Sequence, residues 1–245
     1  MNRYYYDLHI HSCLSPCADD DNTPNNLCGM ASLAGLNIIA LTDHNTCKNC
    51  PAFFDAARSY GMIAIAGMEL TTSEDIHVVC LFERLEDAMK FDEYVNEHRL
   101  RIKNRKDIFG NQFILDSNDD LIGEEEFLLS AATDISIEDV YSLVTSFDGV
   151  CYPAHIDRDA NGIVAVLGSI PPDSEFLLYE LHSAERLEEY SSRFSIDKKR
   201  FVISSDAHYL TDIRDKENYF VIDDEPYSSS LVRKRLFEML RRGNL

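Results

Sequence analysis

Six of the eight histidines lie in short polar segments beside aspartates or a glutamate, and these residue types suit metal coordination. The segments are Asp7-Leu8-His9-Ile10-His11, Thr42-Asp43-His44, Gly67-Met68-Glu69, Asp75-Ile76-His77, Pro153-Ala154-His155 and Ser205-Asp206-Ala207-His208. On an extended strand, His-x-His and Asp-x-His place both side chains on one face, about 6–7 Å apart at a rise of roughly 3.3 Å per residue. Imidazole and carboxylate together form the ligand set of zinc, manganese or iron. Burying this whole set without a cation would leave large desolvation costs.

Each segment lies at one end of a predicted strand, in a chain where strands alternate with helices. The predicted strands are 4–8, 37–41, 62–66, 76–82, 149–153, 176–181, 201–204 and 219–222, and the predicted helices are 24–34, 51–60, 85–95, 136–147 and 228–242. This alternation predicts parallel strands with right-handed crossovers, and seven or eight units favour an α/β barrel. Barrels of this kind carry their chemistry at the C-terminal ends of the strands, where most of these polar residues lie.

Residues 96–133 interrupt the alternation, because they are polar, acidic and only weakly periodic. We therefore expect one domain over residues 1–245, with an insertion or lid at about 96–133.

The ordered set of motifs resembles the PHP (polymerase and histidinol phosphatase) family. Each motif alone is weak, but the set extends from Asp7 to His208 and covers most of the chain in the order typical of the family. The resemblance implies a distorted (β/α)7 barrel, two or three divalent metal ions and hydrolysis of phosphoesters.

The resemblance also implies a set of metal ligands. His9, His11, Glu69 and Asp206 would hold a first metal. Glu69 would bridge to a second metal, also held by His77 and His155. A third would be held by His44, His208 and a residue from the loop after His11, for which we prefer Asp19 over Asp20 and Asp21.

The expected chemistry follows from the metals. A water between two cations is acidified toward neutrality and is expected to attack the phosphorus as a bridging hydroxide. Asp206, Arg158 and His208 are the predicted catalytic residues. His208 would protonate the leaving alkoxide, and Arg158 would either bind phosphate or form a surface ion pair with Asp157 or Asp159. Asp43 is expected to orient a ligand.

The charge of the chain is strongly acidic, with 43 Asp+Glu against 23 Lys+Arg and a net charge of -20. This argues against long nucleic acids and anionic membranes as partners. A small phosphorylated substrate remains compatible, since bound cations can reverse the local sign. The chain shows neither a signal peptide nor an apolar run of about 18 residues, so a cytoplasmic location is expected.

The chain has seven cysteines, for which reduced thiols are the default expectation in that compartment. Cys47 and Cys50 form a Cys-x-x-Cys motif, which suits either a soft-metal or redox site or packed free thiols.

Several functions fit these features. The leading hypothesis is a phosphoesterase acting on a nucleotide or a histidinol-phosphate-like monoester. The alternatives are a nuclease on short oligonucleotides and a non-catalytic metal-binding module, which the near-complete ligand set disfavours. An amidohydrolase is weaker still, since no lysine occupies a corresponding strand end. The substrate, the metal and the oligomeric state remain open at this point.

Overall fold

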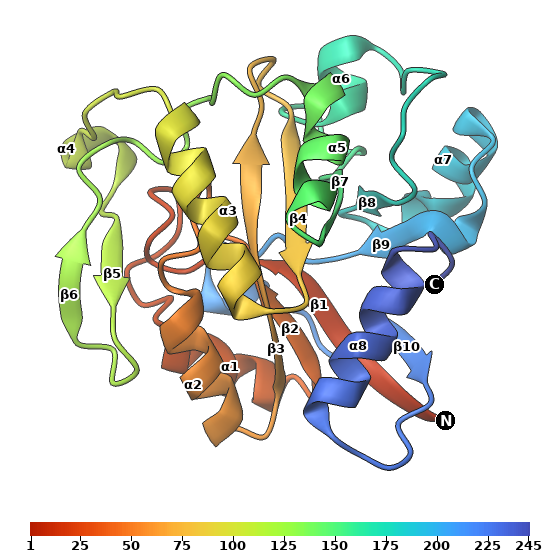
Figure 1. Ribbon diagram of the computed structural model, residues 1–245, viewed down its shortest axis with the longest axis horizontal. Coiled ribbons are helices and arrows are strands. Elements are labelled where there is room, and N and C mark those ends of the chain that lie inside the picture. Colours follow the sequence, from red (N-terminus) through yellow and green to blue (C-terminus); the bar gives the residue numbers. More distant parts are fainter.

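A curled sheet of six strands forms the centre of the computed structural model, which describes residues 1–245 (Figure 1). Along this sheet the strands follow the order β10 (Tyr219–Ile222), β1 (Asn2–Ile10), β2 (Ile38–Leu41), β3 (Ile63–Thr71), β4 (His77–Phe82) and β7 (Gly149–Pro153). Two smaller sheets accompany it. One pairs β5 (Phe113–Leu115) with β6 (Leu121–Glu124), and the other pairs β8 (Tyr179–Leu181) with β9 (Phe201–Ile203).

Strands β1, β2 and β3 are parallel, as the sequence predicted, and helices α1 (Pro24–Leu33) and α2 (Cys50–Ser59) connect them. Helix α1 begins after Thr23, whose hydroxyl accepts a hydrogen bond from the N–H of Asn26 at 3.3 Å. Pro24 suits the first turn because its missing N–H would have no partner there. Every residue of β2 and β3 is buried, so both faces of these strands need cover.

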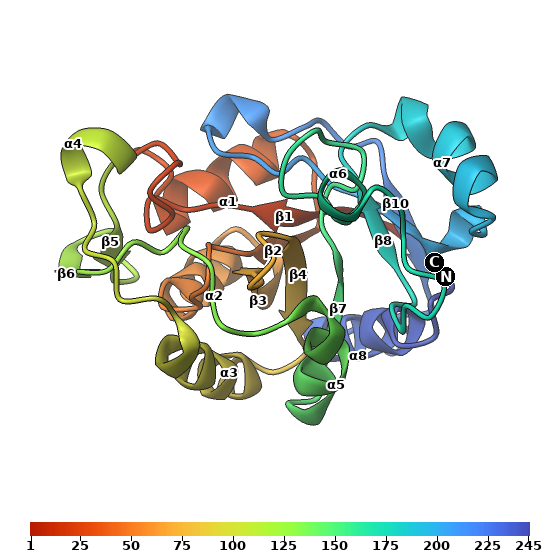
Figure 2. The same ribbon diagram turned by 90° about the horizontal axis from the view of Figure 1, so that it is seen from above.

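Two apolar clusters provide this cover. On one face of β2, Ile39 and Leu41 belong to a cluster of 39 buried residues. This cluster packs beneath α1, α2, α3 (Leu85–His98) and α5 (Ile137–Ser146). On the other face, Ile38 and Ala40 belong to a cluster of 20 buried residues, which includes the apolar side of α8 (Ser229–Leu240). Figure 2 shows the strands at the centre, with α1, α2 and α3 arranged one after another around the curl. The alternation of side chains along β2 thus holds the strand between two packed layers.

The prediction of parallel pairing is wrong at β10, which runs antiparallel to β1. It is also wrong at β4, which runs antiparallel to both β3 and β7. Only residues 72–76 separate β3 from β4, and a parallel crossover needs about a dozen residues or more. The chain instead reverses in a tight turn, where Asp75 has φ 61°. Because β4 runs backwards, its first residue, His77, pairs with Thr71 at the end of β3. The start of β4 therefore lies at the same edge as the ends of the parallel strands.

The β8–β9 sheet lies between β7 and β1 and continues the curl. The N–H of Ile156, just after β7, donates to the carbonyl oxygen of Glu180 in β8 at 2.9 Å. Beyond β9, the N–H of His11 donates to the carbonyl oxygen of Ala207 at 3.0 Å. The mixed α/β fold is confirmed as a curled sheet, whereas a complete (β/α)7 barrel with a continuous ladder is not confirmed.

The segment between α3 and α5 forms a separate projection, at the left of Figure 1. It contains the short helix α4 (Lys106–Phe109) and the β5–β6 hairpin. It contacts the loop after β1, where the N–H of Phe113 donates to the carbonyl oxygen of Cys13 at 3.1 Å. Helix α3 continues to His98, beyond the predicted start of the insertion at residue 96. The description of 96–133 as an insertion remains a prediction.

Two short helices, α6 (Ile163–Leu167) and α7 (Leu187–Phe194), lie between the later strands. No helix has the length and apolar character needed to span a membrane.

Gly67 lets β3 and β4 approach closely, and we expect Gly67→Ala to lower the free energy of unfolding by about 1–3 kcal/mol. A Cβ at this position would lie 2.4 Å from the carbonyl oxygen of Cys80, so the strands would have to move apart. Gly123→Ala is the matched control, because its Cβ would make an ordinary contact, 3.6 Å from Ile114. Urea unfolding of both variants measures the difference, and equal stability of Gly67→Ala and the wild type would contradict this account.

Candidate metal centre

Eight of the nine predicted ligands meet at one edge of the curled sheet. His9 lies near the end of β1, and His11 directly follows that strand. His44 follows β2, Glu69 lies in β3 and His77 begins β4. His155 follows β7, while Asp206 and His208 follow β9. The β1–β2 ladder shifts register between Asp7 and Ile10, an irregularity of the kind that re-aims side chains beside active sites.

Glu69 lies at the centre of this group and is 1% exposed. Its Oε1 atom is 2.9 Å from His77 Nδ1, 3.0 Å from His155 Nε2 and 3.3 Å from His9 Nε2. Its Oε2 atom is 3.1 Å from His44 Nδ1 and 3.4 Å from His11 Nε2. Each oxygen therefore faces a different set of imidazoles, as a carboxylate that bridges two cations would.

Asp206 completes a second donor group with His9, His11 and Glu69. Its Oδ1 atom lies 3.3 Å from His9 Nε2 and 3.2 Å from His11 Nε2, and the two imidazole nitrogens are 3.1 Å apart. Two ring nitrogens at this distance, both facing carboxylates, leave one common position for a cation.

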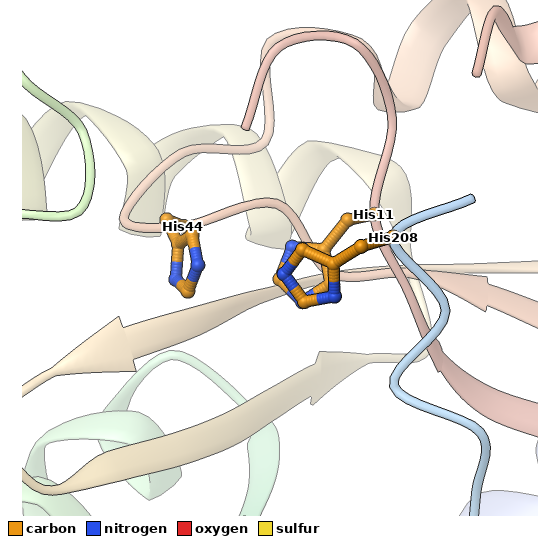
Figure 3. A group of neighbouring side chains, drawn as sticks. All are labelled: His11, His44 and His208. Atoms are coloured by element: carbon orange, nitrogen blue, oxygen red, sulfur yellow. The ribbon is translucent and has the colours of Figure 1, made fainter. Parts of the chain in front are cut away.

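His11, His44 and His208 form a third group of donors, shown in Figure 3. The rings of His11 and His208 stack, with centroids 4.2 Å apart, and the centroids of His11 and His44 are 4.7 Å apart. All three rings come from loops that follow strands β1, β2 and β9.

Asp19, the remaining predicted ligand, does not join these groups. Its Oδ1 atom accepts a hydrogen bond from the N–H of Asp21 at 2.9 Å, within its own loop. Its backbone N–H donates to the carbonyl oxygen of His208 at 2.9 Å. Asp19 thus ties the loop after β1 to the loop after β9, and its role as a ligand remains a prediction.

Glu180 supports the cluster and was missed by the sequence analysis. This fully buried side chain places Oε1 2.8 Å from His9 Nδ1, and the same atom accepts the backbone N–H of His155 at 3.0 Å. A carboxylate on the far ring nitrogen fixes the orientation of an imidazole ligand and increases its basicity. A glutamate within the apolar run Phe176–Leu181 was the available indication in the sequence.

Asp43 orients His11 through a serine, in line with its predicted supporting role. The hydroxyl of Ser15 donates to Asp43 Oδ1 at 2.8 Å and lies 2.9 Å from His11 Nδ1. Asp43 also accepts the N–H and the hydroxyl of Ser12, each at 2.7 Å. The loop after β1 is therefore held in place by this one buried carboxylate.

Opposite charges compensate each other inside the cluster. Burial alone would raise the pKa of Glu69, but His77, His9 and His44 hold that pKa well below its ordinary value. Burial likewise opposes ionisation of Asp206, whose pKa is lowered chiefly by His9 and His11. Burial lowers the pKa of His11, yet Asp206 and Glu69 raise it to about 9. The two carboxylates are ionised at neutral pH, and His11 holds a proton that a cation must displace.

The residues present fit a multinuclear cation site. Within each group the donor atoms lie within 4.8 Å of one another, and all are imidazole nitrogens or carboxylate oxygens. The groups are His9, His11, Glu69 and Asp206; His11, His44 and His208; and His44, Glu69 and His77. Some buried polar atoms also make no aligned hydrogen bond, among them Nδ1 of His44, although Oε2 of Glu69 lies 3.1 Å from it. An unpaired buried nitrogen is costly, and coordination to a cation removes that cost.

The cluster opens into a cavity of about 470 Å³, lined by His44, His77, Arg158 and Cys17 among others. Arg158 pairs with neither Asp157 nor Asp159. Its Nη1 atom instead lies 2.5 Å from Asp206 Oδ2, so a cationic side chain lies beside the donors. Cys17, in the loop after β1, is the cysteine at this cavity.

Cys47 and Cys50 lie outside the cluster. Both are buried, and their thiols point at the carbonyl oxygen of Gly67, at 3.2 Å and 3.6 Å. This arrangement favours packed free thiols over the alternative of a soft-metal or redox site.

A mixed α/β fold with histidines and carboxylates converging at one edge defines a class of metal-dependent hydrolases that act on phosphoester bonds. Residues 7–161 match the model of the PHP domain family, and this is more than half of the chain. The chain therefore belongs to the PHP domain family, which confirms the family resemblance and the prediction of a phosphoester hydrolase.

Similar proteins include nucleases. Over 79 residues the chain is 37% identical to a 5′-3′ exoribonuclease of Haemophilus influenzae, a stretch covering 31% of this chain and 28% of that protein. The lesion-specific endonuclease EndoQ from Pyrococcus furiosus has a similar structure, with a TM-score of 0.68 at 17% identity over 99% of this chain and 56% of that chain. This chain thus spans about half the length of EndoQ.

Two further structures share the fold. Endonuclease Q in complex with a 27-mer duplex that carries an abasic lesion at the active site gives a TM-score of 0.66 at 17% identity, over 95% of this chain and 56% of that chain. A proposed metal-dependent phosphoesterase from Bifidobacterium adolescentis gives 0.55 at 18% identity, over 95% of this chain and 96% of that chain.

The prediction that a small phosphorylated molecule is the partner, to the exclusion of long nucleic acids, is wrong. The proteins that overturn it are the endonuclease solved with duplex DNA and the relative named an exoribonuclease. The net charge of -20 is a sum over the whole chain, whereas the attraction or repulsion of a nucleic acid depends on the local electrostatic field at a binding site. That field includes Arg158 and any cations held by the cluster, which set the local sign.

Glu69→Gln should lower the metal content of the reconstituted protein by at least one equivalent per chain. The amide retains the shape of the side chain but replaces one anionic oxygen, between His9 and His77 or between His11 and His44, with an NH2 group. Metal per chain is measured by mass spectrometry after loading with manganese and desalting. Glu93→Gln, at an exposed position of α3, is the control. An unchanged metal content in Glu69→Gln would remove Glu69 from the ligand set.

Metal affinity should rise with pH up to about 9, the pKa of His11. Below that pH the His11 ring holds a proton, and a ligand must lose its proton to coordinate, so affinity falls as the pH falls. Calorimetry in two buffers of different ionisation enthalpy, at about pH 7.5, should therefore show net proton release on metal binding.

Two histidine variants provide the comparison for this titration. His11→Gln should release fewer protons than the wild type, whereas His98→Gln should match it, because His98 pairs with Asp134 away from the cluster. Affinity that stays constant over this pH range, without proton release, is the opposing result.

Proposed function

We propose that the chain is a metal-dependent nuclease that hydrolyses phosphodiester bonds in a nucleic-acid strand. The observation that carries this proposal is the buried group of imidazoles and carboxylates that opens into a cavity lined by Arg158. The similarity to an exoribonuclease and to EndoQ favours a nucleic-acid substrate over a small monoester. The activity is a proposal for this chain, since it spans only part of either protein.

The ligand assignment follows the distances. His9, His11, Glu69 and Asp206 would hold one cation. Glu69, His77 and His155 would hold a second, because both imidazoles face Oε1 of Glu69. His44 and His208 would hold a third, which Asp19 would complete only after turning away from its own loop. When bound, such cations supply a water of near-neutral pKa and positive charge beside the phosphoryl oxygens.

Arg158 is the residue we propose for charge neutralisation on the substrate. Its guanidinium group lies against Asp206, so it reaches the space where a phosphoryl group would approach the cluster. The side chain remains 40% exposed and already lines the cavity, so a phosphoryl group can approach it. Its planar pair of N–H groups suits two phosphoryl oxygens.

His208 is better suited to accept a proton or a cation than to donate a proton. Its Nδ1 atom lies 2.9 Å from the carbonyl oxygen of Asp206, an arrangement that leaves Nε2 as the unprotonated nitrogen. Burial, followed by His11, lowers the pKa of His208 to about 4, so the ring is neutral at pH 7. We therefore assign His208 to the ligand set, and its predicted role as the acid for the leaving group finds no support in this geometry.

The size of the cavity favours a single strand. A volume of about 470 Å³ lies within the range of small-molecule pockets and suits one nucleotide at a time. A paired base inside a duplex would have to leave its stack to enter. We therefore propose single-stranded ends or extruded nucleotides as the bound form.

Asp206→Asn should slow cleavage of a fluorescent single-stranded oligonucleotide by about 100-fold, because it removes a charge that holds both a cation and Arg158. The measurement is product length against time, with manganese added, for RNA and DNA strands. Asp173→Asn, at an exposed loop position, controls for the change of charge.

Three outcomes would contradict the nuclease proposal. Phosphate release from mononucleotides without cleavage of any oligonucleotide would support the hypothesis of a small phosphorylated substrate instead. Tight metal binding without turnover of any phosphoester would indicate a metal-binding module. Equal rates for Asp206→Asn and the wild type would place the chemistry elsewhere.

A further inference from the structure

Arg158, which lines the cavity, also contacts a group outside its lining, made by His182 and Arg214, and we call these three residues the rim. Arg158 places Nη2 3.2 Å from Nδ1 of His182. Arg214 donates from Nη1 to the carbonyl oxygen of His182 at 2.6 Å, and its Nη2 atom lies 3.2 Å from each ring nitrogen of His182. Both guanidinium groups therefore lie against the same imidazole ring.

The two arginines of this group differ in their partners. Arg158 pairs with Asp206, but no carboxylate lies within 4.0 Å of the guanidinium nitrogens of Arg214. Burial, then Arg158 and Arg214, lowers the pKa of His182, so the ring is neutral at pH 7 and separates two cations without adding a third.

The backbone around this group is fixed before any ligand binds. Asp157 is buried, and its two carboxylate oxygens accept the N–H of His182 at 2.7 Å and the N–H of Ser183 at 2.9 Å. The turn that carries Arg158 and the turn that carries His182 are thus joined by one side chain. A rigid support of this kind reduces the ordering cost of binding an anion.

We propose that Arg158 and Arg214, arranged on His182, form a second anion site that binds the phosphate next to the scissile one in a nucleic-acid strand. This inference rests on the proposed nuclease function. Arg158 links the two sites, because one guanidinium group contacts both Asp206 of the metal cluster and His182 of the rim. Two guanidinium groups, each with a planar pair of N–H donors, recognise the direction of the phosphate oxygens in a way that a lysine cannot match.

The test is binding of dinucleotides to the metal-loaded protein, measured by calorimetry. The probes carry a phosphorothioate linkage, which slows hydrolysis, and have no terminal phosphate, a 5′-phosphate or a 3′-phosphate. We expect one terminal phosphate to lower Kd by about tenfold, the size of one charge-assisted hydrogen bond. Arg214→Gln should abolish this gain, and Arg214→Lys should retain part of it.

The ratio of the Kd without a terminal phosphate to the Kd with one separates recognition of that phosphate from a structural role of Arg214. If Arg214 only holds the loop through the carbonyl oxygen of His182, Arg214→Gln weakens all three probes equally and the ratio is unchanged, which overturns the proposal. Absence of any gain in the wild type also overturns it. Arg193→Gln is the matched control, because Arg193 is an exposed arginine of α7 outside the cavity, and it should keep the full gain.

The same experiment distinguishes this site from the proposed function. A gain that depends on Arg214, together with no cleavage of any oligonucleotide, would keep the anion site and reject the nuclease. Cleavage without that gain would keep the nuclease and reject the site. Inorganic phosphate serves as a fourth probe, and if it binds with a Kd that Arg214→Gln raises while no dinucleotide gains from its terminal phosphate, the rim binds free phosphate and not a strand.

Discussion

Two buried carboxylates, Glu69 and Asp206, face one another across a group of imidazoles, and much of the surrounding structure keeps them there. A buried charge costs several kcal/mol unless neighbouring groups compensate it. Here the compensation comes from His9, whose Nε2 atom lies 3.3 Å from an oxygen of each carboxylate, and from the histidines around it. Divalent cations would provide the same compensation with more charge. The supporting contacts of Glu180 and Asp43 follow from this requirement, because imidazoles that share a charge must keep a fixed orientation.

The fold meets this requirement because six strands bring one end to the same edge of the curled sheet. Strands β1, β2, β3, β7 and β9 bring their C-terminal ends there, and β4 brings its start. The reversal at β4 brings His77 to the edge where β2 and β3 end, and the β8–β9 sheet brings Asp206 next to β1. The backbone also adopts costly conformations there. Asn45, His155 and Asp206 have φ values of 51°, 28° and 53°, in a region that residues other than glycine rarely adopt. Strain of this kind persists where surrounding contacts enforce it, and it concentrates at functional sites.

The sequence predicted most of the elements and most of the residues that meet in the cluster, because periodicity and residue type are local properties. The start of α1 at Pro24 and the strand Gly149–Pro153 were predicted from capping residues and apolar runs alone. The reversal of β4 was missed because its pattern is that of any buried strand, although the short link 72–76 excludes a helical crossover. Glu180, His182 and Arg214 carry no motif and join the site only through tertiary folding. Net charge misled the choice of partner, since a sum over the chain does not describe the field at one cavity.

Anomalous diffraction from crystals of the manganese-loaded protein tests the central claim most directly, since it locates cations without reference to activity. The account predicts at least two anomalous peaks within coordination distance of the cluster, about 2.0–2.2 Å from its nitrogen and oxygen atoms, with Glu69 between two of them. Peaks only at surface carboxylates, or an empty cluster in which Glu69 still contacts His9 and His77 directly, would contradict it.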